Sequence, residues 1–299
     1  MREFPDWGPV VGKFRDSVTR CIRRVWTLAV LLPGLLTALA GCSPMTNYED
    51  AAMPRFAGTH ARGGMVFDGI LDVVTWNIQH GEEIDAAINE LQTTPELQNA
   101  DILLLQEMDE TGVWTIARTL SYDYVYFPAS VSPENGKNFG NAVLSKWSIL
   151  DASKIVLPHR NPRNGQMRIA VRADVDVDGR TVQVYSVHIE TPWLGPSQRG
   201  DQVETTVEPI SADSPYVVVG GDFNTLTDQG VADTTDLVAE DGLMPASDPA
   251  QSTMQVAGVG LTPDLIFARG FELAATGVPT STAASDHLPV WSQLRFAGD

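Results

Sequence analysis

The chain has very few cysteines: two among 299 residues, Cys21 and Cys42, both near the N-terminus. The remainder has none with which to form a disulfide, which excludes a disulfide-stapled scaffold and leaves packing as the source of stability. A hydrophobic content of 43% can fill a sizeable core. We therefore expect one packed domain after the N-terminal segment.

Basic residues are also scarce. The whole chain has 20 Lys and Arg against 38 Asp and Glu, and after Gly41 the counts are 14 and 35, a formal net charge of −21. Proteins that bind long nucleic acids through phosphates normally present a basic face, and no Lys/Arg cluster occurs outside the N-terminal segment. We therefore expect no stable nucleic-acid partner. Most acidic residues would form a solvated surface, but some could hold a divalent metal.

The N-terminal apolar run is short. Leu28 to Ala40 spans thirteen residues, which is too short to cross a bilayer and suits a secretory signal preceded by arginines. It closes with Leu39-Ala40-Gly41-Cys42, which resembles the lipobox of bacterial lipoproteins. We expect residues 1–41 to be a signal segment and Cys42 to carry the lipid, so that the protein is exported and anchored to the cell envelope. The alternative is a structural cysteine after an ordinary signal or a short membrane anchor.

The rest of the chain divides into a tether and a domain. Residues 42–64 have little periodicity and mix Pro, Gly, Asn, Thr and charge, which predicts a tether. Residues 65–299 alternate short apolar strands with helical or loop segments. Predicted helices cover 82–92 and 197–210; predicted strands cover 71–76, 101–105, 122–128, 141–144, 168–177, 181–188, 216–219, 261–267 and 290–296. Asp178-Gly179 predicts a hairpin between the two strands that flank it.

One strand is followed by a notable group of polar residues. The apolar run Tyr216 to Val219 stops at Gly220-Gly221 and leads into Asp222-Phe223-Asn224. Asp222 and Asn224 can point the same way while Phe223 turns into the core, so a proton-accepting carboxylate would lie beside a hydrogen-bonding amide. The alternative is that both residues merely satisfy the backbone of a turn.

Other polar residues also stand at strand ends. Glu107 comes directly after a leucine-rich strand and needs a partner or a metal if it is buried, or else caps the next helix. His188 ends the predicted hairpin, and Asp264 begins a short apolar strand. Asp286 and His287, before the last strand, suit one metal ligand and one imidazole that contacts phosphate.

Together the motifs WN, QE, SVH, GDFN, D-x-IF and SDHxP occur in an order that closely resembles the endonuclease/exonuclease/phosphatase superfamily. That superfamily includes pancreatic deoxyribonuclease, AP endonucleases, sphingomyelinases and inositol polyphosphate 5-phosphatases. The resemblance covers about Leu71 to Phe296. It implies an α/β fold, a four-layer α/β/β/α sandwich in which two mixed β-sheets face each other and the site lies where strands end.

The resemblance also implies roles for these residues. Asn77, Glu107 and Asp286 would hold or support a divalent ion, and hard oxygen ligands suit Mg²⁺ or Mn²⁺. Asp222 would activate the attacking water and Asn224 would steady charge on the phosphorus oxygens. Asp264 would orient His287, which would bind the scissile phosphate together with His188 and Arg168. We find no sequence counterpart for the acidic residue that orients the histidine of deoxyribonuclease, so the protonation role of His188 stays open.

These roles predict a metal-dependent phosphoesterase, expected to be a monomer, that hydrolyses a phosphodiester or phosphomonoester by in-line attack of water. The acidic charge modestly favours a small-molecule or lipid substrate. The alternatives are a secreted endonuclease acting on DNA or RNA, and a membrane-anchored module that binds a phosphate ligand without chemistry. Sequence and fold class do not choose among the substrates.

Overall fold

Apolar residues on the central strands alternate between two faces, and this alternation builds the layers of the fold. In the computed structural model, which describes residues 45–298, Val73 and Leu104 point between two β-sheets. Their neighbours Val74 and Leu103 point outward, under helices. Both faces of the central strands are therefore buried, which explains why their sequences are almost continuously apolar.

The first sheet has seven strands. Their order is β1 (Phe56–Gly58), β4 (Asp123–Val131), β5 (Asn138–Ser145), β3 (Ile102–Met108), β2 (Leu71–Asn77), β15 (Val290–Phe296) and β14 (Phe271–Gly277). β2 and β3 are parallel, and their carboxyl ends therefore lie at the same edge of the sheet.

The second sheet has six strands. Their order is β10 (Met244–Pro245), β13 (Asp264–Arg269), β9 (Tyr216–Asp222), β8 (Arg180–His188), β7 (Ile169–Val177) and β6 (Ser148–Val156). A separate two-stranded ribbon pairs β11 (Met254–Val256) with β12 (Val259–Leu261).

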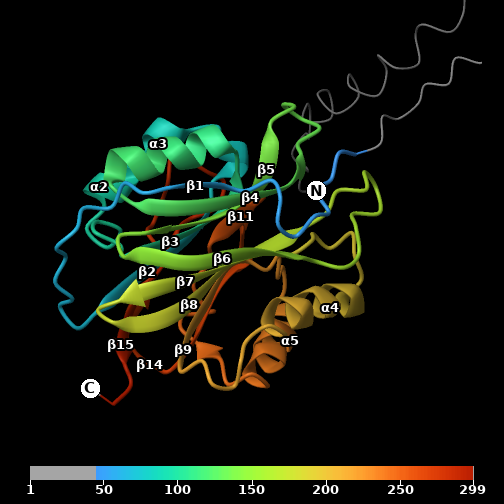
Figure 1. Ribbon diagram of the computed structural model, residues 1–299. Coiled ribbons are helices and arrows are strands. Elements are labelled where there is room, and N and C mark those ends of the chain that lie inside the picture. The colour runs from blue at the N-terminus through green and yellow to red at the C-terminus, as the bar shows by residue number, and fades with distance from the viewer. Residues whose placement is uncertain (1–44, 299) are drawn as a thin grey trace, which may run out of the picture. The chain divides into compact units, whose positions relative to one another are not determined.

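Helices cover the outer faces of both sheets (Figure 1). α2 (Ile84–Thr93) and α3 (Glu110–Leu120) pack on the first sheet, and the 3-10 turn η1 (Gln79–Gly81) precedes them. α4 (Pro196–Val207) and α5 (Asp228–Ala239) pack on the second sheet. Three separate apolar clusters fill the spaces between these four layers. The predicted α/β/β/α sandwich of two mixed sheets is confirmed.

The predicted hairpin is confirmed as β7 and β8, joined through Asp178 and Gly179. Both turn residues have positive φ, 52° and 81°, as a two-residue type I′ turn requires. At the other end of β8, Gly221 lets the next strand approach closely, because a Cβ there would lie 2.0 Å from the carbonyl oxygen of Val187. The absence of a side chain therefore permits β8 and β9 to end side by side.

Part of the segment predicted as a tether instead packs on the domain. β1, within it, pairs with β4, and the Phe56 ring lies 5.8 Å from that of Tyr126. The buried ammonium of Lys154 donates hydrogen bonds to the carbonyls of Tyr48 (2.8 Å) and Met53 (2.9 Å). The tether prediction is therefore wrong for these residues, because strand pairing and a buried lysine outweigh a composition typical of linkers.

The same segment begins beside the loop that joins β6 to β7. The Asn47 side chain donates to the Gly165 carbonyl at 2.9 Å and accepts from the Met167 amide at 3.0 Å. Across residues 45–298, no helix is long and apolar enough to cross a membrane. The predicted signal segment, 1–41, and the lipidated Cys42 lie outside the described residues.

Candidate active site

Three site residues lie side by side on neighbouring strands of the second sheet. His188, the last residue of β8, pairs in register with Asp222, the last residue of β9. Asp222 pairs in turn with Asp264, the first residue of β13. All three side chains are buried. Strand pairing therefore brings together residues that are up to 76 positions apart in the sequence.

The first sheet supplies Asn77 and Glu107 to the same edge. Glu107 stands in a β-bulge of β3, where the register with β5 shifts between Leu105 and Met108. Its φ of 61° lies in the left-handed region, which is uncommon for a residue with a side chain. A bulge of this kind re-aims a side chain, so Glu107 leaves the alternation of the strand and reaches the site.

The amide of Asn77 links the two sheets. Its nitrogen donates to Glu107 Oε1 at 3.2 Å and to Asp222 Oδ2 at 3.0 Å. Its oxygen accepts the backbone N–H of Gln79 at 3.2 Å. The amide nitrogen thus joins a carboxylate from each sheet, which fixes the distance between the two.

The predicted contact between Asp264 and His287 is confirmed. Asp264 Oδ2 lies 2.8 Å from His287 Nδ1 and accepts a hydrogen bond from Thr253 Oγ1 at 2.6 Å. Burial alone would lower the pKa of His287, but the nearby carboxylates, Asp264 above all, raise it to about 10. His287 is therefore an imidazolium at neutral pH, able to donate a hydrogen bond from Nε2.

Asp222 is buried and polarised by its neighbours. Burial raises the pKa of Asp222 to about 7, while the charge of His287 and hydrogen bonds from Asn224 and Asn77 act in the opposite direction. A carboxyl group with a pKa near neutrality can take up a proton during a reaction at that pH. Asp222 thus has the protonation behaviour of a general base.

Of the predicted arrangement around Asp222, the burial of Phe223 is confirmed. The Phe223 side chain is buried against Phe267, their ring centres 5.5 Å apart. The Asn224 backbone donates to Asp222 Oδ1 at 2.8 Å, and its side-chain nitrogen donates to the Ile189 carbonyl at 2.9 Å. One N–H of the Asn224 amide is therefore already engaged by the protein.

His188 meets an arginine on one side and carboxylates on the other. Its Nδ1 lies 3.3 Å from Arg168 Nη1, and its Nε2 lies 3.4 Å from Asp222 Oδ2 and 3.9 Å from Glu107 Oε1. Arg168 is held by the fully buried Glu190, with 3.2 Å between Nε and Oε2.

Strained backbone is concentrated at this edge. Nine residues other than glycine have a positive φ in the described chain, and four of them, Gln79, His80, Glu107 and Asn224, belong to the site or adjoin it. Such conformations cost on the order of 1–3 kcal/mol each and persist where surrounding contacts impose them. The concentration supports a functional role for this end of the sheets.

The family model for the endonuclease/exonuclease/phosphatase family matches residues 74–287. The chain belongs to this family. Its members are phosphoester hydrolases, generally dependent on a divalent metal. The resemblance inferred from the six motifs is thereby confirmed.

Solved structures of this family share the fold at low sequence identity. A family protein from Leptotrichia buccalis has 18% identity and a TM-score of 0.62, covering 76% of this chain and 100% of that one. A mannosyl-6-phosphatase from Bacteroides thetaiotaomicron has 18% identity and a TM-score of 0.59 over 76% and 100%. TDP2 from D. rerio, complexed with single-strand DNA product, has 19% identity and a TM-score of 0.59 over 76% and 100%. Among curated proteins no match is found.

Two groups of residues could take the metal of such an enzyme. Asp222, Asp264 and His287 offer ligand atoms within 4.8 Å of one another, but Nδ1 of His287 and one oxygen of Asp264 are already engaged with each other at 2.8 Å. Glu107, by contrast, is a partly accessible carboxylate. The exposed Asp286 follows Ser285, whose Oγ donates a hydrogen bond to the carbonyl of Asn77 at 2.7 Å, and this bond holds the Asp286 backbone beside the end of β2. Carboxylate oxygens of this kind fit a hard divalent ion.

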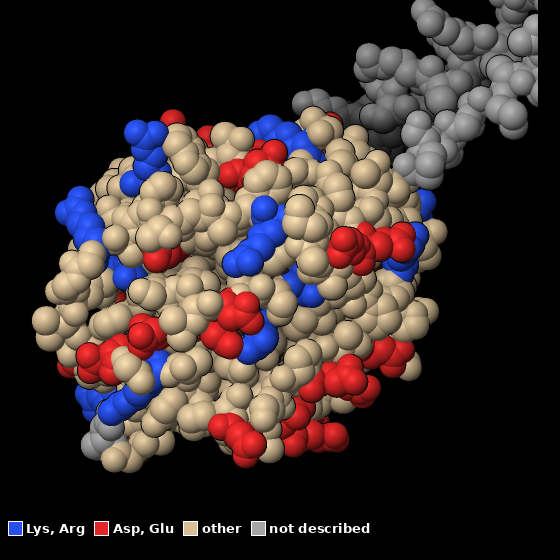
Figure 2. Space-filling model, in the orientation of Figure 1, with Lys and Arg blue, Asp and Glu red and all other residues tan. Residues whose placement is uncertain are grey.

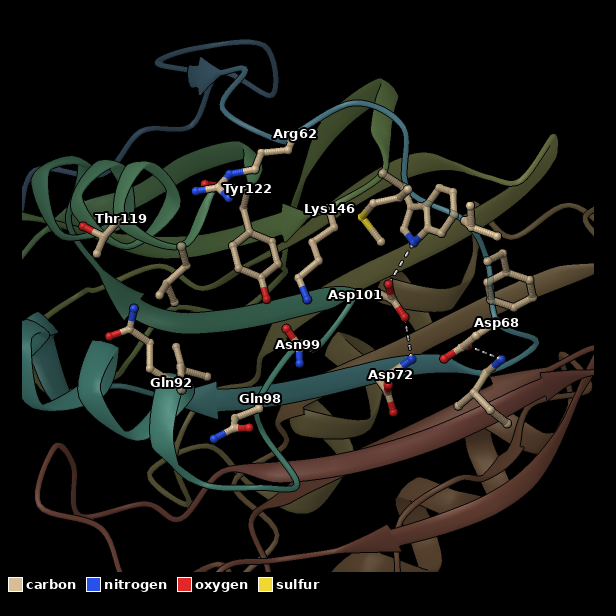
Figure 3. A pocket seen from close by; sticks show the side chains of 18 residues that line it. Arg62, Asp68, Asp72, Gln92, Gln98, Asn99, Asp101, Thr119, Tyr122 and Lys146 are labelled. Atoms are coloured by element: carbon tan, nitrogen blue, oxygen red, sulfur yellow. Dashed lines mark hydrogen bonds between the residues drawn. The ribbon is translucent and has the colours of Figure 1, made fainter.

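A cavity of about 670 Å³ lies at the opposite ends of β2 and β3 (Figure 3). Lys146, Tyr122, Asp72 and Asp101 are among its lining residues. Burial raises the pKa of Asp101 to about 6, and its carboxylate accepts hydrogen bonds from the Asp72 amide and from Trp147 Nε1. Asp101 therefore joins the beginnings of two strands. None of the predicted site residues lines this cavity.

The sequence interpretation missed several residues near the site. His80 follows Asn77 by three positions, and its Nε2 lies 3.6 Å from Glu107 Oε2. Glu190 lies two positions beyond His188, and Arg199 of α4 donates to the carbonyls of Phe223 and Asn224 at 3.1 and 2.6 Å. The available signal for Glu190 was a charged residue two positions beyond a buried strand.

Proposed function

We propose that the protein is a Mg²⁺- or Mn²⁺-dependent phosphoesterase that hydrolyses a phosphodiester or phosphomonoester by in-line attack of water, with a small-molecule or lipid substrate favoured. The observation that carries this proposal is the Asn77 amide, which holds Glu107 and Asp222 together from two sheets. One carboxylate is thereby placed for a metal and the other for the nucleophile.

The proposal assigns a role in the reaction to each of these residues. Asp222 orients the attacking water and accepts its proton, in keeping with its raised pKa. His287, protonated and held by Asp264, donates a hydrogen bond to the substrate phosphate. Asn224 offers its remaining N–H to a phosphorus oxygen. A divalent ion held by Glu107, with Asp286, would supply positive charge against the negative charge that develops on phosphate.

The surface charge supports the choice of substrate. Figure 2 shows acidic side chains gathered at the lower right, where Figure 1 places α4 and α5. Between residues 196 and 241, Arg199 is the one basic residue. Besides the buried Asp222, nine residues of this range are acidic: Asp201, Glu204, Glu208, Asp213, Asp228, Asp233, Asp236, Glu240 and Asp241. A long polyanion would meet repulsion on this side, whereas a small phosphoester would be penalised less.

The test is hydrolysis of bis-p-nitrophenyl phosphate by the purified protein, with and without Mg²⁺ or Mn²⁺. We expect release of p-nitrophenol that stops in EDTA and returns when the metal is restored. Phospholipid, small phosphodiester and duplex DNA would then be compared at low and physiological salt. Metal-independent release would reject the metal role. Duplex cleavage that exceeds the other substrates at both salts would favour the nuclease alternative, as in the fold relative bound to a DNA product.

We also propose that the protein is exported and attached to the cell envelope through a lipid on Cys42, and that it acts as a monomer without a stable nucleic-acid partner. The support is the arginine-flanked apolar run that ends at Leu39-Ala40-Gly41-Cys42. Metabolic labelling with a fatty acid, compared between the wild type and Cys42→Ser, tests the attachment.

A further inference from the structure

We propose that Arg168 and Glu190 are positioning residues that fix His188 as a neutral hydrogen-bond donor, with its proton on Nε2 and no share in proton transfer. This inference deepens the proposed function and rests on it for the substrate that His188 would contact. It departs from the expectation that Arg168 contacts phosphate.

The guanidinium of Arg168 is hydrogen-bonded to two protein side chains. Nε and Nη2 lie 3.2 and 3.5 Å from the two carboxylate oxygens of Glu190, and Nη1 lies 3.3 Å from His188 Nδ1. Arg168 is only 6% exposed, and its guanidinium carbon lies 5.2 Å from the centre of the Phe139 ring. The planar group is therefore fixed in orientation as well as in position.

Glu190 is fixed even more firmly. Its side chain is fully buried, and Oε1 accepts hydrogen bonds from Asn161 Nδ2 (3.0 Å), from the Thr191 amide (2.8 Å) and from Thr191 Oγ1 (2.9 Å). Burial alone would raise the pKa of Glu190, but the charge of Arg168 and these hydrogen bonds lower it. Glu190 is therefore an anion that holds Arg168 from behind.

The tautomer of His188 follows from the chemistry of its neighbour. A guanidinium stays protonated in proteins and has no acceptor, so every contact it makes with a ring nitrogen is a donation. Nδ1 of His188 must therefore present its lone pair to Arg168. The proton of the neutral ring then lies on Nε2, which faces Asp222 Oδ2 at 3.4 Å and Glu107 Oε1 at 3.9 Å.

A carboxylate in place of Arg168 would do the opposite: it would accept a hydrogen bond from a protonated Nδ1, and its negative charge would favour a charged ring. Here Arg168 donates to Nδ1 instead, and a ring whose Nδ1 accepts a hydrogen bond carries only the one proton on Nε2. The ring can give a hydrogen bond to a phosphate oxygen from Nε2 but is held neutral. The proton of the attacking water is then left to Asp222.

The first test reads the tautomer directly and requires no activity. In the full-length protein with ¹⁵N-labelled histidine at pH 7, long-range ¹H–¹⁵N correlation distinguishes a protonated from an unprotonated ring nitrogen for each of the five histidines. The His188 signals are assigned by their loss in His188→Gln. We expect an unprotonated Nδ1 and a protonated Nε2. A proton on Nδ1 in the wild type would overturn the proposal, whether or not any substrate is hydrolysed.

The second test separates positioning from general support of the fold. Glu190→Gln keeps the shape but removes the charge that holds Arg168, and we expect a roughly 10- to 100-fold loss of kcat/KM, as for partners that orient active-site ligands. In a His188→Ala background the same change should cost less than threefold, because its target is gone. Glu49→Gln, which breaks an exposed pair with Arg160, is the matched control and should leave activity unchanged. Equal losses in both backgrounds would refute the role.

Discussion

Replacement of Asp222 by asparagine should separate stability from activity, in a way that depends on pH. The variant has nearly the same shape but cannot ionise. In the wild type, burial raises the pKa of Asp222 from 3.8 to about 7. The folded state therefore binds more protons than the unfolded state between these two values, and stability falls as pH rises through the window.

The size of the effect follows from the shift. About three pKa units at 1.36 kcal/mol each correspond to a loss on the order of 4 kcal/mol across the window, which the variant lacks. Against this gain, an amide at position 222 turns an N–H toward a donor, either Asn77 Nδ2 or the Asn224 backbone. That mismatch costs about 1–3 kcal/mol at every pH. The variant should be less stable than the wild type at pH 4 and more stable at pH 8.

Urea denaturation of both proteins at pH 4, 6 and 8, with metal chelated, measures the free energy of unfolding directly. Hydrolysis of bis-p-nitrophenyl phosphate with Mg²⁺ measures turnover, for which loss of a general base predicts a fall of about 10²- to 10⁴-fold. A stability difference between variant and wild type that stays constant from pH 4 to pH 8 would show that folding does not raise the pKa of Asp222. A change in KM alone would reject its role as the base.

Three further predictions concern the metal, the N-terminal segment and the anchor. Glu107→Gln should lower activity by orders of magnitude while the circular dichroism spectrum stays the same, and excess Mn²⁺ should restore part of it; full activity would reject Glu107 as a ligand. Lys154→Met removes two hydrogen bonds to the segment around Tyr48 and should speed proteolysis there, whereas the exposed Lys137→Met should not; equal rates would show that strand pairing alone holds the segment. Cys42→Ser should release the protein from the membrane fraction with unchanged specific activity, and unaltered fractionation would contradict the lipid anchor.

The parts of the fold that sequence patterns predicted are those with strong local signals. The Asp178-Gly179 turn needs a positive φ at both positions, and that requirement is visible in the dipeptide itself. α3, α5, β6 and β14 were not predicted, although α3 buries Val113, Ile116 and Ala117 on one face. β6 is an edge strand whose residues are mostly not buried, and α5 buries only Thr234 and Val238. Their apolar periodicity is weak because little of their surface faces a core.

The site was predictable to the extent that its residues stand at strand ends. Asp222, Asp264 and His188 are brought together by strand register, and each carries a recognisable motif. The pairing of Glu190 with Arg168 could not be read from the sequence, because the two are 22 positions apart and meet only after β7 and β8 pair. The tether prediction was wrong for a similar reason, because β1 forms only by pairing with β4.

The N-terminal segment has a consequence for how the enzyme would meet its substrate. Asn47 is fastened to the loop that ends at Arg168, so the described chain begins at the edge where the catalytic residues lie. Two residues separate Met45 from Cys42, so the three steps along the chain reach at most about 11 Å. A lipid on Cys42 would hold the opening of the site near the bilayer surface. The rate of turnover would then depend on the surface concentration of phosphoesters in the membrane rather than on their concentration in bulk solution.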